Sequence, residues 1–436
     1  MNRDGIIEAS RAFFNANHAI KPFVPGETYI PPTGKVLDED DCAHLIDASL
    51  DMWLTTGRFG EEFESKLAMV FGRKLAKLTV SGSAANLLAF STLTSWKLGK
   101  ERLMPGDEVI TVAAGFPTTV APIIQNGCIP VFVDIDVETH NVDVDALEAA
   151  IGPKTRAVML AHSLGNPFDV VRIAALCEKH NLYLIEDCCD AFGAKMNGQG
   201  VGTFGQLATL SFYPAHHITM GEGGAVLMNQ MKLGRICESF RDWGRDCYCK
   251  PGKDNTCGKR FEWQLGDLPE GYDHKYTYSH IGYNLKVSDM QAALGVSQLN
   301  KLDDFIGKRN SNFEGLTRRI KAAGLEEFVH LPKATPNSEP SWFGFLMTLR
   351  DGSSLDRTQI IQTLEKHKVG TRLLFGGNLL RQPAFMGQNT RTSGGLENTD
   401  KVMRDSFWIG VWPGINDEML DYMVDILAKT LRGDLK

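Results

Sequence analysis

Leu182-Tyr183-Leu184-Ile185-Glu186-Asp187 is an apolar run that ends in two acids, and this stretch decides the fold. Residues 182–185 have the length and composition of a buried strand, and the preceding segment Val170–His180 has apolar residues near helical spacing. A strand that follows a helix in this way is typical of a parallel sheet covered by helices. An aspartate at the carboxyl end of such a strand lies where open α/β sheets bind ligands, so Asp187 is a candidate site residue.

The same alternation of short apolar runs and helical patterns continues on both sides of this strand. The sequence predicts two further helices, Ala84–Trp96 and Val144–Ala150. It also predicts strands over Ala76–Val80, Glu108–Val112, Pro130–Asp134, Ala157–Leu160, Ala208–Phe212 and Ala225–Met228. We therefore expect an α/β fold with a large, mainly parallel sheet.

Two changes of pattern divide the rest of the chain. Residues 246–274 are rich in Cys, Gly, Lys and Asp without periodicity, and they predict a long inserted loop of a kind that is usually functional or disordered. A long helical pattern, Lys301–Ala323, then leads into a smaller α+β region. We expect an N-terminal segment over 1–30, a large domain over 31–300 with the insertion at 246–274, and a small C-terminal domain over 301–436.

The composition excludes several classes of protein. Lys and Arg number 46 and Asp and Glu 53, so the formal net charge is −7, which argues against a dedicated nucleic-acid surface. No run approaches the roughly 18 apolar residues of a membrane span, and the first residues carry no apolar signal segment. We expect a cytoplasmic protein that binds neither nucleic acid nor membrane, with its nine cysteines outside any disulfide framework.

Three further motifs accompany Asp187. Residues 79–85 (TVSGSAA) combine a strand end, a glycine turn and a helix start, whose free N–H groups suit a phosphate. Residues 211–217 (SFYPAHH) place a serine and two histidines at a strand end, and residues 282–286 (GYNLK) form a polar turn before an amphipathic helix. Each motif alone is more typical of a capped helix, a turn or a structural histidine than of a cofactor site.

Together, in this order and spacing, the motifs resemble the sugar aminotransferase and dehydratase branch of fold-type I vitamin B6 enzymes, over residues 31–436. The resemblance implies an aminotransferase-like fold, in which the large domain binds pyridoxal or pyridoxamine phosphate, and a homodimer with shared active sites. It implies Ser83, Ala84 and Ser211 at the cofactor phosphate, Phe116 on the cofactor ring, Asp187 at the pyridinium nitrogen, and Asn284 at a neighbouring subunit's phosphate. Asp190 and Tyr213 flank these motifs as further candidates for the cofactor site and for orienting the sugar.

The chain departs from the family pattern at His216, where most members carry the lysine that holds the cofactor as a Schiff base. Imidazole forms no stable Schiff base, so we expect free pyridoxamine 5′-phosphate. The ordinary pKa of histidine, about 6.5, suits removal of a proton from the cofactor's C4′ carbon while a sugar hydroxyl leaves. His216 is thus the expected catalytic base and His217 its rival. The expected outcome is dehydration of a ketimine adduct, and the alternative is a non-catalytic B6-fold regulator.

Four cysteines, Cys189, Cys247, Cys249 and Cys257, form the pattern Cys-x57-Cys-x-Cys-x7-Cys, while Cys188 should face away from Cys189. The spacing alone fits zinc, an iron–sulfur cluster or no metal equally well. Reductive loss of a 3-hydroxyl requires two electrons, which zinc cannot carry.

With His216, the cysteine pattern resembles the subgroup that converts CDP-4-keto-6-deoxy-D-glucose on the route to 3,6-dideoxyhexoses. That resemblance implies a [2Fe–2S] cluster on the four cysteines and a separate NADH-dependent flavin and iron–sulfur reductase as electron donor. The alternative is a cluster-independent 3-dehydratase that acts on a GDP- or dTDP-sugar and finishes by hydrolysis.

Overall fold

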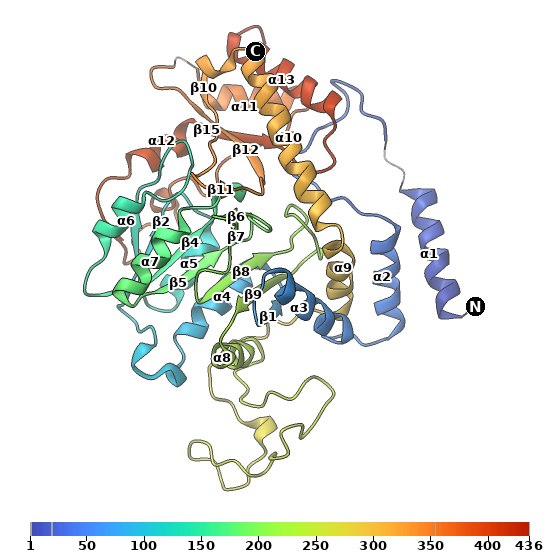
Figure 1. Cartoon of the computed structure of the whole chain (residues 1–436), viewed down its shortest axis with the longest axis vertical. Helices are drawn as coiled ribbons and strands as arrows, with labels where there is room; N and C mark the ends of the chain where they lie inside the picture. The colour runs from blue at the N-terminus through green and yellow to red at the C-terminus, as the bar shows by residue number, and fades with distance from the viewer. Residues whose placement is uncertain (1, 19–20, 354, 436) are drawn as a thin grey trace.

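An eight-stranded sheet lies at the centre of the computed structural model, which describes residues 2–18, 21–353 and 355–435 (Figure 1). Its strand order is β1-β9-β8-β5-β4-β2-β3-β14. Among the described residues, β9 alone is antiparallel to both of its neighbours, so the sheet is mainly parallel, as predicted. In that order, the strands are Leu75–Thr79, Gly224–Met228, Leu207–Ser211, Tyr183–Asp187, Thr155–Ala161, Glu108–Val112, Ile129–Val133 and Arg391–Thr392.

Helices cover both faces of this sheet because successive strand residues point to opposite sides. On β5, Ile185 packs into the apolar cluster under α4, α5 and α8, whereas Leu184 packs into the cluster under α6 and α7. Helices α3 and α9 cover the remainder of the second face. These helices are α3 (Arg58–Val70), α4 (Gly82–Leu93), α5 (Pro117–Gln125), α6 (Val144–Ala150), α7 (Val170–His180), α8 (Met231–Arg241) and α9 (Asp289–Leu299).

The predicted helix at 84–96 differs from the observed one at both ends. Helix α4 begins at Gly82 because the Ser81 hydroxyl accepts the N–H of Ala84 at 3.1 Å, which makes Ser81 the N-cap. The helix ends at Leu93, and a 3₁₀ segment, η1 (Trp96–Glu101), follows. The seven predicted strands each agree with the structure to within two residues.

The C-terminal part has its own antiparallel sheet, in the order β10-β12-β15-β13, and its own apolar core. The short strand β14 from this part joins the large sheet beside β3, where Arg391 pairs with Glu108 at 2.8 Å. The domain limits of the sequence analysis stay predictions. The elements here are α10 (Leu302–Ala322), β10 (Val329–His330), β12 (Gly344–Leu349), α11 (Arg357–Lys366), β13 (Thr371–Arg372), α12 (Glu397–Asp405), β15 (Ser406–Gly410) and α13 (Asp417–Arg432).

Smaller elements complete the chain. Two N-terminal helices, α1 (Arg3–Asn17) and α2 (Glu39–Leu50), pack against each other beside α9 (Figure 1). A small sheet, β11-β6-β7, joins Ser338–Glu339 to the hairpin Lys195–Met196 and Gln199–Gly200. Short 3₁₀ segments lie at Ser163–Gly165, His274–Tyr276, Leu325–Glu327 and Leu379–Arg381.

The insertion at 246–274 extends beyond α8, away from the sheet (Figure 1). Asp246 anchors its start: its carboxylate bonds Lys97, the Nε2 of His274 at 2.8 Å and the hydroxyl of Ser279 at 2.7 Å. Burial alone would raise the pKa of Asp246, but these partners lower it to about 2. The insertion is therefore docked on η1 by a charged network.

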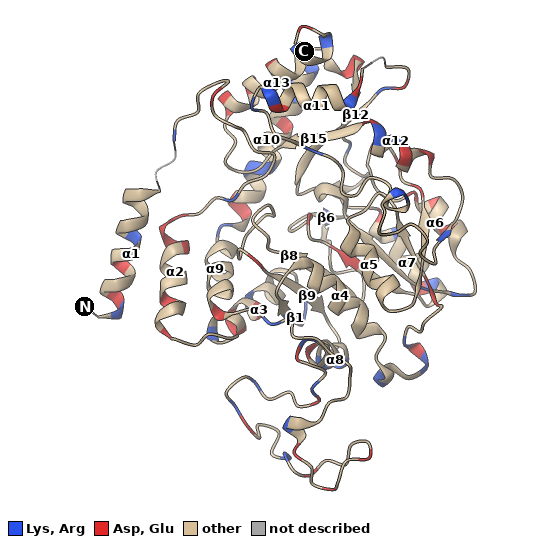
Figure 2. Cartoon of the chain, turned by 180° about the vertical axis from the view of Figure 1, so that it is seen from behind, with Lys and Arg blue, Asp and Glu red and all other residues tan. Residues whose placement is uncertain are grey.

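The exterior mixes both signs of charge, as the alternating Lys, Arg, Asp and Glu positions in Figure 2 show. Within the described ranges, no helix combines the length and the apolarity that crossing a bilayer requires.

Candidate active site

Asp187 ends β5 as a buried carboxylate with three donors. Its Oδ2 accepts the Asn86 side-chain amide at 2.8 Å and the Thr119 hydroxyl at 2.7 Å, and its Oδ1 accepts the N–H of Cys189 at 3.1 Å. Asn86 lies on α4 and Thr119 on α5, so two of the helices that cover this face of the sheet hold the acid. Sequence reasoning missed both donors, although each lies within four residues of a predicted motif.

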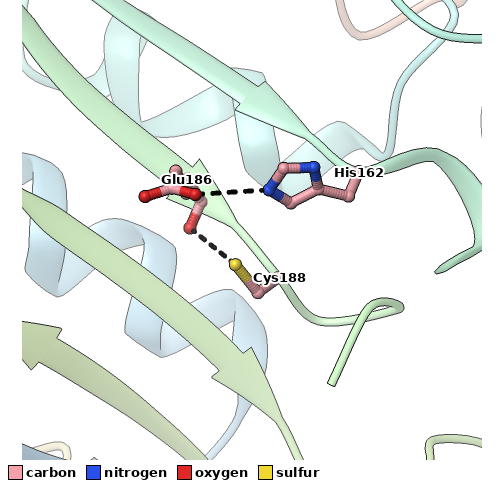
Figure 3. A group of neighbouring side chains, drawn as sticks. All are labelled: His162, Glu186 and Cys188. Carbon is pink, nitrogen blue, oxygen red and sulfur yellow. Dashed lines mark hydrogen bonds and ion pairs between the residues drawn. The ribbon is translucent and has the colours of Figure 1, made fainter. Parts of the chain in front are cut away.

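Glu186, the neighbour of Asp187 on β5, points to the other face and forms a second buried group with His162 and Cys188 (Figure 3). Its oxygens accept the N–H groups of Gly202, Phe204 and Gly205 at 2.6–2.8 Å, and His162 Nε2 lies 3.5 Å away. Burial alone would raise the pKa of Glu186, but these contacts lower it. These contacts hold β5 in place from the face of the sheet opposite Asp187.

The predicted phosphate turn packs tightly against β8. A Cβ atom added to Gly82 would lie 2.4 Å from the Cβ of Ser211, so no larger residue fits. Ser83 is exposed, and its hydroxyl donates to Thr118 at 3.1 Å. The N–H of Ala84 already bonds to the hydroxyl of Ser81, which leaves it less suited to a phosphate than the sequence predicts.

His216 and His217 have different environments. The Nδ1 of His216 lies 3.3 Å from Asp190 Oδ1, and its side chain retains 15% of its exposure. His217 is buried, its Nε2 bonds the carbonyl of Ser341 at 3.0 Å, and burial together with Arg309 holds its pKa well below the ordinary value. The accessible imidazole is therefore that of His216, which favours it over His217 as a base.

Arg309 on α10 supports the loop that carries His216, and sequence reasoning missed it. Its guanidinium is fully buried and donates to the carbonyls of Ala215 and His216 at 3.2 Å each and of Phe343 at 3.3 Å. Burial lowers the pKa of Arg309 to about 10. The sequence gives no signal for this role, because Arg309 lies about 90 residues from His216 among other charged residues of the helix.

The remaining predicted cofactor residues lie at the surface. Phe116 precedes α5 with 47% of its surface exposed, and its ring meets Phe375 edge to face at 6.3 Å. Tyr213 is also exposed. The exposed Asn284 accepts a hydrogen bond from Lys286 Nζ at 2.7 Å. These positions are open to a cofactor, a sugar or a second subunit.

The cysteines fall into two groups. Cys189 follows Asp187 in the site, and burial and Asp187 raise the pKa of its thiol well above the ordinary value. Cys247, Cys249 and Cys257 lie in the insertion, where the N–H of Cys249 donates to Cys247 Sγ at 3.5 Å and the Thr256 hydroxyl donates to Cys249 Sγ at 3.1 Å. Cys188 is fully buried on the opposite side from Cys189, as predicted.

The four predicted cluster ligands do not gather into a closed metal site within one chain. Across residues 2–18, 21–353 and 355–435, the one set of three or more His, Cys, Asp or Glu ligand atoms within 4.8 Å of one another is His162, Glu186 and Cys188. In that set, the carboxylate is already occupied by backbone N–H groups. Within these ranges the four thiols are therefore not gathered around a single metal ion.

Known proteins resemble the chain over almost its whole length. It is 56% identical to the lipopolysaccharide biosynthesis protein RfbH of Salmonella typhimurium over 94% of both chains. It is 51% identical to the dTDP-4-dehydro-2,6-dideoxy-D-glucose 3-dehydratase of Saccharopolyspora spinosa, over 98% of this chain and 92% of the relative.

The solved structure of the E. coli GDP-4-keto-6-deoxy-D-mannose-3-dehydratase with bound hydrated PLP superposes with a TM-score of 0.82 at 27% identity, covering 92% of this chain and all of that one. This likeness confirms the predicted fold-type I, aminotransferase-like architecture. The model of the DegT/DnrJ/EryC1/StrS aminotransferase family matches residues 35–428. The chain therefore belongs to the DegT/DnrJ/EryC1/StrS aminotransferase family.

Proposed function

We propose that the chain is a pyridoxamine phosphate-dependent nucleotide-sugar 3-dehydratase. The observation that carries this proposal is the accessible imidazole of His216, beside Asp190, at the position where the family resemblance places a lysine. Relatives with 51% and 30% identity are named as 3-dehydratases of dTDP- and GDP-linked sugars. The buried Asp187 with its three donors argues against a regulator that has lost its cofactor site.

The residues present fit the cofactor. Asn86, Thr119 and the N–H of Cys189 stabilise the charged form of Asp187, which suits a partner for a protonated ring nitrogen. The start of α4 with Ser83, and Ser211 beside Gly82, would hold the phosphate. When bound, the amine form of the cofactor would supply an amine for the sugar ketone and an acidic proton at C4′.

His216 would then act as the base. Asp190 lies 3.3 Å away on the Nδ1 side of the ring and would orient it, which would leave Nε2 to take a proton from C4′. Arg309 holds the backbone beneath this ring, and Phe116 would cover the cofactor ring from the open side. The proton held on His216 can then pass to the departing 3-hydroxyl, which leaves as water, so the chain would eliminate water rather than transfer an amino group.

We further propose CDP-4-keto-6-deoxy-D-glucose as substrate, on the route to 3,6-dideoxyhexoses. Reduction would use a [2Fe–2S] cluster on Cys189, Cys247, Cys249 and Cys257 and an NADH-dependent flavin and iron–sulfur reductase. The lipopolysaccharide role of the 56% identical Salmonella relative supports the pathway. A dTDP-linked substrate is the second candidate, because the 51% identical relative is named for one.

One experiment tests the dehydratase directly. The protein is loaded with pyridoxamine phosphate and offered CDP-, dTDP- and GDP-linked 4-keto-6-deoxyhexoses in D₂O, and deuterium at C4′ and loss of the 3-hydroxyl are followed by mass spectrometry. We expect exchange and dehydration with the CDP sugar. If neither C4′ exchange nor loss of the 3-hydroxyl occurs with any of the three nucleotide sugars, the proposed dehydratase activity is rejected. If the dTDP sugar reacts faster than the CDP sugar, the substrate is a dTDP-linked sugar.

A further inference from the structure

Cys189 and the start of the insertion lie at opposite ends of helix α4. A Cβ atom added to Gly82, the first residue of α4, would be 3.1 Å from Cys189 Sγ. The insertion attaches beyond the other end, where Trp96 Nε1 donates to the carbonyl of Ser279 at 2.7 Å and Lys97 pairs with Asp246, the neighbour of Cys247. The 12 residues of α4 span about 18 Å at the helical rise of about 1.5 Å per residue.

Farther along, the insertion contacts α3 and the segment before it. Lys250 pairs with Glu61 on α3 at 2.7 Å, and Gly252 lies against Trp53. Its three cysteines are linked by short contacts: the N–H of Cys249 donates to Cys247 Sγ at 3.5 Å, and the hydroxyl of Thr256, the neighbour of Cys257, donates to Cys249 Sγ at 3.1 Å. Each of the three side chains is partly exposed. A three-thiolate set is thus one ligand short of the four that hold a [2Fe–2S] cluster.

We propose that Cys189 of the partner subunit completes this set, so that each cluster site is built from two copies of the chain. This inference rests on the cluster of the proposed function. A twofold dimer gives the arrangement in duplicate, because an insertion that reaches the partner's site implies the reverse contact as well. Two complete sites result, each with three thiols from one subunit and one from the other.

The exposed surface near both groups fits a second copy as occupant. At the base of the insertion, Ile281 is 95% exposed. Also exposed are Tyr278, three residues before it, and Trp243, whose backbone lies against Gly282. At the mouth of the site, Phe116 and Tyr213 are exposed as well. Large apolar side chains gathered on two surfaces mark an interaction face, and an isologous contact would bury both surfaces at once.

A mixed dimer separates ligation within one chain from ligation between chains. One chain carries Cys189→Ser, and a differently tagged chain carries Cys247→Ser, Cys249→Ser and Cys257→Ser. Ligation between chains leaves one intact site in the mixed dimer, whereas ligation within a chain leaves none. Iron, sulfide and the EPR signal are measured per dimer after anaerobic reconstitution with iron and sulfide, and bound pyridoxamine phosphate reports folding.

We expect each parent homodimer to hold no cluster and the mixed dimer to hold half of the wild-type iron and sulfide. A mixed dimer without iron, or a Cys189→Ser parent with full iron, would overturn the proposal. Cys42→Ser, a partly exposed cysteine outside both groups, should keep full iron as the matched control. Wild-type protein that binds no iron or sulfide would overturn both this inference and the [2Fe–2S] cluster of the proposed function. C4′ exchange tests the proposed dehydratase activity separately. Cys189→Ala replaces the serine variant if that variant loses its pyridoxamine phosphate.

Discussion

Replacing Arg309 with methionine should cost little stability and much activity. The change removes three hydrogen bonds to carbonyls at 3.2–3.3 Å, each worth about 1.5 kcal/mol for a charged donor at that length. It also removes a buried charge whose pKa is lowered to about 10, which is worth about 3 kcal/mol in the opposite direction. The free energy of unfolding should therefore fall by only about 1–2 kcal/mol.

Exchange at C4′ should fall much further. Without Arg309, the backbone of Ala215 and His216 loses its support, and a shift of about 1 Å in a catalytic group can cost about 100-fold in rate. Urea denaturation measures the stability, and deuterium exchange at C4′ in the loaded enzyme measures the activity. Arg309→Lys should restore part of the rate, because one charged donor remains.

A second arginine on α10 serves as a control, because its removal takes the same charge from the helix without touching the loop of His216. Arg319 on α10 is partly exposed and pairs with Asp421 at 2.6 Å, away from the loop of His216, so Arg319→Met should leave exchange unchanged. The reasoning would be refuted by undiminished exchange in Arg309→Met under conditions where His216→Asn abolishes it.

His216→Asn should retain pyridoxamine phosphate, measured by absorbance, and lose C4′ exchange; retained exchange would assign the base to another group. Gly82→Ala should lower the free energy of unfolding by about 1–3 kcal/mol and weaken cofactor binding, because the added Cβ would lie 2.4 Å from the Cβ of Ser211. Unchanged urea denaturation and cofactor titration curves would show that the turn has room for a side chain at residue 82. Burial lowers the pKa of His140 to about 4, from about 6.5 in an unfolded chain. The neutral His140 therefore makes its full contribution to the free energy of unfolding above pH 6.5. That contribution falls by up to about 3 kcal/mol as the pH falls to about 4, because the unfolded chain takes up the proton first. His140→Asn, which tolerates the positive φ of 57° there, should flatten the urea midpoint between those pH values, and an unchanged slope would exclude His140 as its source.

The sheet and its helices were predictable because their signals are local. Each strand is a short apolar run beside a helical pattern, and β5 with Asp187 shows both the element and its ligand-binding end within six residues. The end of α4 was predicted too late, since Leu93 is followed by residues that still look helical but form a 3₁₀ segment.

The parts of the site that sequence did not reveal depend on contacts across the fold. Asn86 and Arg309 act on residues about 90 or more positions away, and their polar side chains look like ordinary helix residues in the sequence. The cysteine spacing gives ligand types, but it cannot show that Cys189 and Cys247 lie at opposite ends of one helix. The number of residues between two cysteines does not determine how far apart they lie in the folded chain.

The two reactive groups of the site are supported by separate parts of the molecule. Glu186 and its buried partners fix β5 and Asp187 from behind, whereas Arg309 fixes the loop of His216 from α10. A substitution at residue 216 therefore leaves the support of Asp187 untouched. A fold arranged in this way can change its reaction at one residue and keep its cofactor, which is a route by which an aminotransferase ancestor could give rise to a dehydratase.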